Sequence, residues 1–148
     1  MKIEIVRSNR KKFLNLLLLA DEKESMIDKY IERGDMFALY ENDEVKSACV
    51  VTNEGQGIYE LKNIATLEEF QRKGYGTQLL KYILHFYRGQ AAVMYVGTGD
   101  NTSALSFYLE KGFIYSHRIR HFFTDNYDYP IFECGKQLVD MVYLKMDL

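Results

Sequence analysis

The segment Gln71-Arg72-Lys73-Gly74-Tyr75-Gly76-Thr77 decides how this chain is expected to fold. It lies between an extended apolar stretch, 58–67, and an amphipathic run, 78–88, so the pattern predicts a strand, a glycine-bearing turn and a helix. The two glycines leave the N–H groups of the turn uncrowded, and the first turn of a helix has N–H donors without intrahelical partners. Together with Arg72 and Lys73, these donors predict a site for a pyrophosphate-bearing cofactor.

A Gly-x-Gly before a helix also occurs as a tight connection that binds nothing. The segment is neither a Walker loop nor the three-glycine dinucleotide fingerprint. A second segment, 101–113, favours the functional interpretation. It forms the next expected helix and carries Asn101 at its start, Tyr108 near its end, and then Gly112-Phe113.

Together the two segments resemble the GNAT superfamily of acyl-CoA N-acyltransferases. The family's cofactor signature is Gln/Arg-x-x-Gly-x-Gly/Ala, and it is matched by Gln71, Gly74 and Gly76. Its later helix has an Asn near the start and a Tyr ahead of Gly-Phe, which the 101–113 segment matches. The resemblance covers residues 58–116 by motif and the rest of the chain by the order of its elements.

Composition restricts the class of protein. With 148 residues, 47% of them hydrophobic and only one proline, the chain is expected to form a single compact domain, 1–148. A net charge of −2 argues against a nucleic-acid binder. The two cysteines, Cys49 and Cys134, form no disulfide framework, which favours a reducing, cytoplasmic location. The most apolar run, 14–20, is too short to span a membrane.

No metal site is expected either. His117 and His121 fall in an expected strand, where four residues span about 13 Å, too far to share one ion. His85 is alone on a helix.

The periodicity predicts an α/β (α+β) chain in the order βααβββαβαββ. Expected strands cover 2–6, 36–40, 45–52, 58–66, 91–96, 113–123 and 138–148. The turn pair Asn42-Asp43 is expected to join the second and third of them as a hairpin. Expected helices cover about 9–19, 22–33, 74–88 and 101–112. Ser8 or Asn9 would cap the first of them, Gly34 would end the second, and Asp100 or Asn101 would cap the last. The order is also that of the GNAT fold. The resemblance therefore implies a central mixed, mostly antiparallel sheet with helices on both faces and a splayed parallel strand pair.

The resemblance implies acetyl-CoA as acyl donor. Backbone N–H groups along the turn would hold its pyrophosphate, and the cofactor-binding residues would be Gln71, Arg72, Lys73, Gly74, Tyr75, Gly76, Thr77 and Asn101. The pantetheine arm would run beside the strand that ends at Thr66, pairing with it like an added strand. One N–H from Ile64, Ala65 or Thr66 would then stabilise the oxyanion.

Two side chains are candidates for catalysis. Tyr108 could protonate the departing thiolate, since a phenol (pKa about 10) and a thiol (about 8.5) are close enough for proton transfer. The alternative is a core aromatic of an amphipathic helix. Glu60, a carboxylate within an otherwise apolar strand, could act as general base, directly or through water. It could instead be exposed or paired with Lys62, two residues along the strand.

The acceptor is expected to be an amine. The segment 122–137 interleaves acidic and aromatic side chains, namely Asp125, Asp128 and Glu133 with Tyr127 and Tyr129, which suits an amine-bearing acceptor. A solvated loop would have the same composition. The expected activity is transfer of acetyl to a primary amine of a small molecule or peptide. A non-catalytic CoA-binding regulatory module and an interaction domain are the alternatives. An edge strand near the C-terminus could pair two chains as a homodimer.

Overall fold

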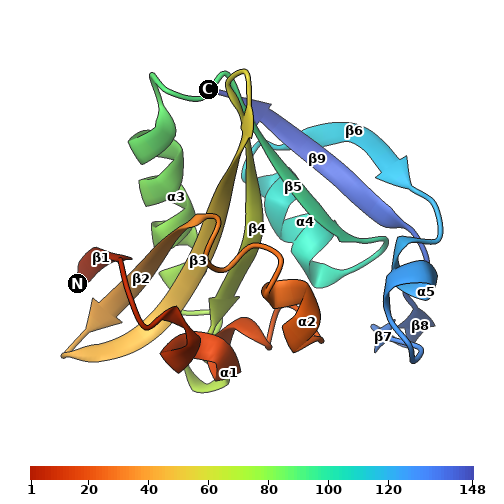
Figure 1. Cartoon of the computed structure of the whole chain (residues 1–148), viewed down its shortest axis with the longest axis horizontal. Coiled ribbons are helices and arrows are strands. Elements are labelled where there is room, and N and C mark those ends of the chain that lie inside the picture. The colour runs from red at the N-terminus through yellow and green to blue at the C-terminus, as the bar shows by residue number, and fades with distance from the viewer. The chain divides into compact units, whose positions relative to one another are not determined.

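The computed structural model describes residues 1–148, which divide into two compact units, 1–92 with Leu148, and 93–147 (Figure 1). The first unit contains an antiparallel sheet in the order β1-β2-β3-β4. Its strands are β1 (Lys2–Val6), β2 (Asp35–Glu41), β3 (Glu44–Gly55) and β4 (Ile58–Thr66). Its helices are the short η1 (Arg10–Phe13), α1 (Leu14–Leu17), α2 (Glu24–Ile27) and η2 (Glu68–Phe70), and the longer α3 (Tyr75–Tyr87).

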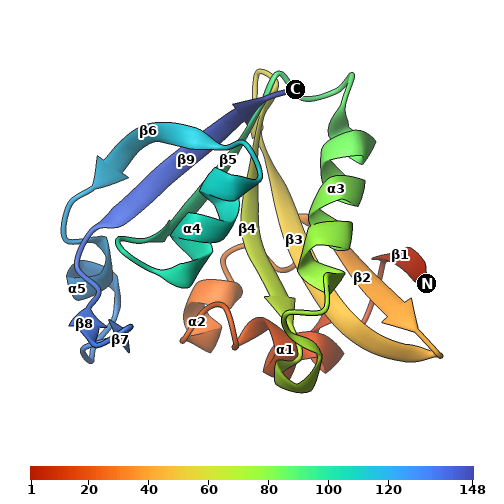
Figure 2. The ribbon, with the colours of Figure 1, turned by 180° about the vertical axis from the view of Figure 1, so that it is seen from behind.

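Helices cover both faces of this sheet. Figure 1 shows α1 and α2 in front of β3 and β4, and Figure 2 shows α3 on the opposite side. The alternation of strand side chains explains this arrangement. Met36 and Ala38 of β2 join the core cluster that includes Leu17 and Ile27. Phe37, between them, packs edge-on against Tyr87 of α3, with ring centroids 6.1 Å apart.

In the second unit, β9 lies between β5 and β6 and pairs antiparallel with both. The elements are β5 (Val93–Gly99), α4 (Ser103–Glu110), β6 (Ile114–Ile119), α5 (Phe122–Asn126), β7 (Phe132–Glu133), β8 (Lys136–Gln137) and β9 (Met141–Asp147). β7 and β8 form a separate small hairpin. Pairing of two chains through an edge strand of this unit stays a prediction.

Two expected strands and one expected hairpin turn are confirmed. Strands 2–6 and 58–66 have the predicted bounds. The β2–β3 connection turns at Asn42 and Asp43, whose φ values of 54° and 62° are typical of a tight hairpin. Cys49 is fully buried, which raises the pKa of its thiol. No helix is long and apolar enough to cross a membrane.

The predicted helix 22–33 is wrong in length, and Gly34 does not end it in the expected way. α2 ends at Ile27, and turns continue to Gly34. A Cβ at Gly34 would lie 2.7 Å from the carbonyl oxygen of Val51, so the glycine permits close approach of β3 instead of a left-handed helix stop. Arg10 donates from Nη1 to the carbonyls of Ile31 and Gly34, both at 2.6 Å, and so holds this turn segment.

A Gly34→Ala variant is therefore expected to lose about 1–3 kcal/mol of unfolding free energy, because the added methyl meets backbone that cannot move aside easily. Denaturant unfolding measures the loss. Gly55→Ala is a useful contrast, because a Cβ there meets nothing within 4 Å and only its φ of 93° is strained. Equal stability of Gly34→Ala and the parent chain would contradict the packing role.

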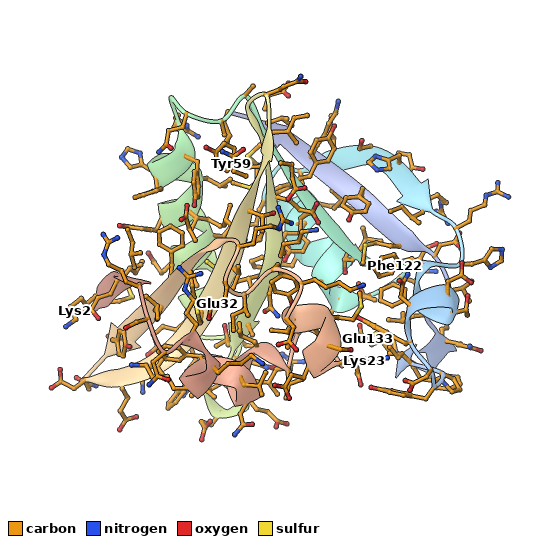
Figure 3. All side chains as sticks on the ribbon, viewed as in Figure 1. Lys2, Lys23, Glu32, Tyr59, Phe122 and Glu133 are labelled. Carbon is orange, nitrogen blue, oxygen red and sulfur yellow. The ribbon has the colours of Figure 1, made fainter.

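Two further expectations are corrected. Asn9 does start η1, but its φ is 54° and its side chain makes no capping hydrogen bond. The expected strand 113–123 stops at Ile119, and α5 begins at Phe122 (Figure 3). His121 precedes α5 with φ 58°, and its N–H donates to Asp140 Oδ1 at 3.0 Å. His117 and His121 are therefore not on one strand. Asp140 lies immediately before β9, so the contact made where the strand ends comes from a distant part of the chain. The local sequence pattern gives no sign of it.

Candidate functional site

The connection from β4 to α3 forms the turn that the glycines predict. Gly74 precedes the helix with φ 91°, and Arg72 also adopts a left-handed conformation, with φ 63°. Gln71 donates from Nε2 to the carbonyl of Thr66 at 3.0 Å, so the loop closes back on the end of β4. Gln78 N–H is the first in the helix to bond within it, to the carbonyl of Gly74 at 3.0 Å. The preceding N–H groups lie at the open end of a 13-residue helix.

Packing within this unit does not require a glycine at position 76. A Cβ there would make only an ordinary contact, 3.6 Å from Thr66 Oγ1, and its φ is not left-handed. Its lack of a side chain therefore keeps the space in front of the helix start clear. Arg72 and Lys73 beside it are exposed. Exposure of these two side chains fits both alternatives, contact with a bound anion and contact with solvent only.

The loop is anchored to the β2–β3 hairpin by contacts that the sequence did not predict. Lys46, whose side chain is only 7% exposed, places its ammonium 3.5 Å from the ring centroid of Phe70. Lys73 approaches the same ring at 5.8 Å. The hydroxyl of Tyr75 donates to Glu41 Oε2, and this hydrogen bond raises the pKa of Tyr75. These contacts hold Phe70 and Tyr75, the residues on either side of the turn, against the β2–β3 hairpin.

The end of β4 distinguishes the three candidate oxyanion donors. Leu67 N–H donates to the carbonyl of Lys46 at 3.0 Å, and Ser47 Oγ donates to the carbonyl of Ala65 at 2.8 Å. Backbone groups alternate along a strand, so residues 65 and 67 direct theirs to β3. Ile64 and Thr66 therefore direct their N–H groups to the other edge of β4.

β4 contains a bulge beside Glu60. Leu61 lies opposite Val51 and Asn63 lies opposite Val50, so Lys62 is the extra residue. Glu60 and Lys62 form an ion pair at 3.1 Å, with side chains 14% and 24% exposed. The ion-paired arrangement considered for Glu60 is therefore present, and it places a charged carboxylate in a partly buried position.

The surroundings of this pair carry further charge. Thr52 donates to Glu54 at 2.5 Å, and Arg33 contacts the same carboxylate at 3.0 Å. The pKa of Glu54 is lowered by the Thr52 hydrogen bond first, and also by the charges of Arg33 and Lys62. Lys62 thus lies within electrostatic range of Glu54 as well as Glu60.

In the second unit, Thr102 is the residue that caps α4, and the expected cap at Asp100 or Asn101 is wrong. Thr102 Oγ1 accepts from Leu105 N–H at 3.2 Å. Asn101 has φ 58° and lines a pocket of about 240 Å³ with Asp100 and residues 136–140. A left-handed residue cannot cap in this way, because the capping position needs extended backbone.

Tyr108 lies near the end of α4 and is 5% exposed. Its ring packs edge-on against Phe107 and Phe113, at centroid distances of 5.3 and 5.6 Å. Gly112, with φ 102°, ends the helix and lets Phe113 turn back into this cluster. The ring is therefore part of the unit's core, which is compatible with either interpretation of its hydroxyl.

The acidic and aromatic segment is less uniform than its composition suggests. Asp125 lies in α5, Tyr127 is buried, and Tyr129 is 44% exposed. Glu133 lies in the β7–β8 hairpin (Figure 3). The segment is thus a short helix followed by a hairpin instead of one open loop. No group of three or more His, Cys, Asp or Glu gathers as a metal site.

Comparison with known proteins identifies the class. The profile of the Acetyltransferase (GNAT) family matches residues 6–113. The chain belongs to this acetyltransferase family, which confirms the α/β class and the GNAT fold that the two motifs predict.

The individual relatives cover the whole chain. An uncharacterised N-acetyltransferase, YvbK of Bacillus subtilis, is 35% identical over 100% of this chain and 97% of its own length. A GNAT family acetyltransferase of Elizabethkingia anophelis, solved with acetyl-CoA bound, is 34% identical, with a TM-score of 0.93 over 99% of this chain and 97% of its own. A Bacillus subtilis acetyltransferase solved with CoA is 36% identical, with a TM-score of 0.90 over 99% and 98%.

Proposed function

We propose that this chain transfers the acetyl group of acetyl-CoA to a primary amine. The observation that carries the proposal is the β4–α3 turn, where bare backbone at Gly74 and Gly76 opens a 13-residue helix next to the end of β4. Such a helix start suits a pyrophosphate. The acetyl-CoA-bound relative from Elizabethkingia anophelis supports the same assignment.

In the proposed reaction, N–H groups of residues 72–77 bind the pyrophosphate, with Arg72 and Lys73 adding positive charge. The acyl oxygen accepts a hydrogen bond from Ile64 or Thr66, whose N–H groups face away from β3; Ala65 is disfavoured because its backbone faces β3. Asn101 also contributes to cofactor binding.

Glu60 accepts one proton from the ammonium group, and the free amine then attacks the thioester carbon as the C–S bond breaks. The nitrogen of the new amide loses its second proton to water. Tyr108 protonates the departing thiolate of CoA. Each of these residues is partly or fully buried in its own unit, which favours transfer away from bulk water.

The test is a panel of primary amines, with acetyl-CoA as donor and release of free CoA thiol as the readout. Amine-dependent thiol release, with an acetylated product of the expected mass, supports the proposal. A chain that binds acetyl-CoA but releases thiol at the same slow rate with and without any amine would be a CoA-binding regulatory module instead. Failure to bind any CoA species would favour an interaction domain.

The role of Glu60 makes a pH-dependent prediction. An aliphatic amine has a pKa near 10.4, so at neutral pH about one part in a thousand is unprotonated. Glu60→Gln retains shape and polarity but cannot accept the amine proton. We expect a rate about 10²-fold lower near pH 7, with a deficit that shrinks as the pH rises and the amine deprotonates by itself.

Lys62→Gln serves as the matched control, because it breaks the same ion pair and leaves the carboxylate in place. Initial rates from pH 6 to 10 separate the two variants. If Glu60→Gln overlays the parent chain at every pH, Glu60 has no part in the proton transfer.

A further inference from the structure

One buried polar atom in the chain has no hydrogen-bond partner, and it lies on β4. Asn63 is 4% exposed, and its side-chain oxygen Oδ1 is enclosed without a donor. Native proteins leave few buried acceptors unpaired, because burial removes the hydrogen bonds that water would donate and an unpaired oxygen has none to replace them. An oxygen of this kind is ready to accept a hydrogen bond from a ligand.

The rest of the side chain fixes the orientation of the amide. Nδ2 donates to the carbonyl of Leu17 at 3.0 Å and to Tyr30 Oη at 3.1 Å. The Tyr30 hydroxyl in turn donates to Asp21 Oδ2 at 2.9 Å. Rotating the amide by 180° would bring its oxygen against the Leu17 carbonyl, which is also an acceptor. The unpaired atom is therefore the oxygen.

The bulge at Lys62 brings this oxygen to the same face of the sheet as Glu60. Asn63 lies opposite Val50, and Glu60 lies opposite Thr52. Residues 50 and 52 of β3 point to one face because they are two apart, and Val50 belongs to the core cluster with Leu17 and Ile27. In a regular strand, residues 60 and 63 would point to opposite faces.

The two side chains are thus neighbours on the α1–α2 face. Their partner residues on β3 are two positions apart, so the side chains start about 7 Å from each other. Both offer oxygen acceptors, one a carboxylate and one a neutral amide. A primary ammonium has three N–H donors and can serve both oxygens at once.

We infer that Asn63 Oδ1 binds the acceptor amine, with Glu60 as the second acceptor for the same nitrogen. The inference rests on the proposed acetyl transfer and names the amine's binding residue. After Glu60 takes one proton, a hydrogen bond from a remaining N–H to Oδ1 holds the nitrogen in place while its lone pair is free to attack. The oxygen is enclosed, so the amine reaches it when the segment carrying Leu17 and Tyr30 shifts. That segment consists of two four-residue helices and turns, and its core residues Leu17 and Ile27 move with it.

The experiment compares two variants that both lack the amide N–H donors and of which only one has acceptor oxygens at this position. Asn63→Leu and Asn63→Asp both lose the N–H donors to Leu17 and Tyr30, but the aspartate retains an acceptor oxygen. We expect Asn63→Leu to raise the KM of the amine about tenfold while the KM of acetyl-CoA stays unchanged. Asn63→Asp should stay within about twofold of the parent chain for the amine, by the same reasoning.

The outcomes separate the possibilities. An equal rise in amine KM in both Asn63 variants, or no rise in either, overturns the inference and leaves the amide as a structural link or the partner of a buried water. Absence of amine-dependent turnover in the parent chain overturns the proposed function, and this inference with it.

A second measurement does not depend on the activity of the variants. Adding the amine to the CoA-bound parent chain should shift the side-chain amide resonances of Asn63, identified by their loss in Asn63→Asp. Resonances that stay in place at saturating amine overturn the inference.

Discussion

A Gly76→Val variant is expected to lose at least about 100-fold in affinity for acetyl-CoA. The valine side chain would project into the space that the pyrophosphate needs in front of the α3 start, and charge-assisted hydrogen bonds to the first-turn N–H groups would be lost. Two such bonds at about 1.5–3 kcal/mol each account for a loss of this size. Isothermal titration calorimetry with acetyl-CoA measures it.

The fold should survive this change. A Cβ at residue 76 meets only Thr66 Oγ1, at 3.6 Å, and the residue does not have a left-handed φ. Gly76→Ala is the matched control, because the family signature accepts Ala at this position, and it should bind acetyl-CoA close to the parent chain. A folded Gly76→Val with unchanged affinity would mean that the pyrophosphate binds elsewhere.

Tyr108→Phe is expected to reduce turnover about 100-fold with nearly unchanged affinity for acetyl-CoA. The substitution removes only the hydroxyl that is proposed to protonate the thiolate, and general acid catalysis is worth about 10²–10⁴-fold. The ring itself, which packs against Phe107 and Phe113, is retained. Steady-state rates and calorimetry on the same preparations separate the two effects.

Tyr115→Phe provides a control of the same chemistry in the same unit, because Tyr115 is 55% exposed on β6. Its turnover should match that of the parent chain. Equal turnover of Tyr108→Phe and the parent chain would show that Tyr108 is only a core aromatic. An acyl donor with a more acidic thiol should reduce the Tyr108→Phe deficit, since its thiolate leaves without a proton.

Local patterns predicted most of the regular elements. The exact bounds of β4 follow from an apolar run between Gly57 and the η2 turn, and the hairpin at Asn42-Asp43 follows from residues that tolerate positive φ. The α3 helix follows from an apolar stripe with period 3.6. These signals are local, because each depends on residues within one or two turns of chain.

The errors fall where distant residues act on the backbone. The segment after α2 has a helical pattern, yet Arg10 binds its carbonyls and β3 packs against Gly34, so the chain turns instead. Thr102 caps α4 because Asn101 adopts a left-handed conformation. Sequence periodicity carries no information on such contacts.

For the candidate site, the sequence by itself determined the family, the glycine turn and the position of a carboxylate on β4. These follow from residue type and spacing alone. Only the tertiary structure decided that Ile64 and Thr66, and not Ala65, face away from β3, and that Glu60 pairs with Lys62. The bulge that brings Asn63 and Glu60 to one face was also decided there, because strand register depends on how β3 and β4 pair across the sheet.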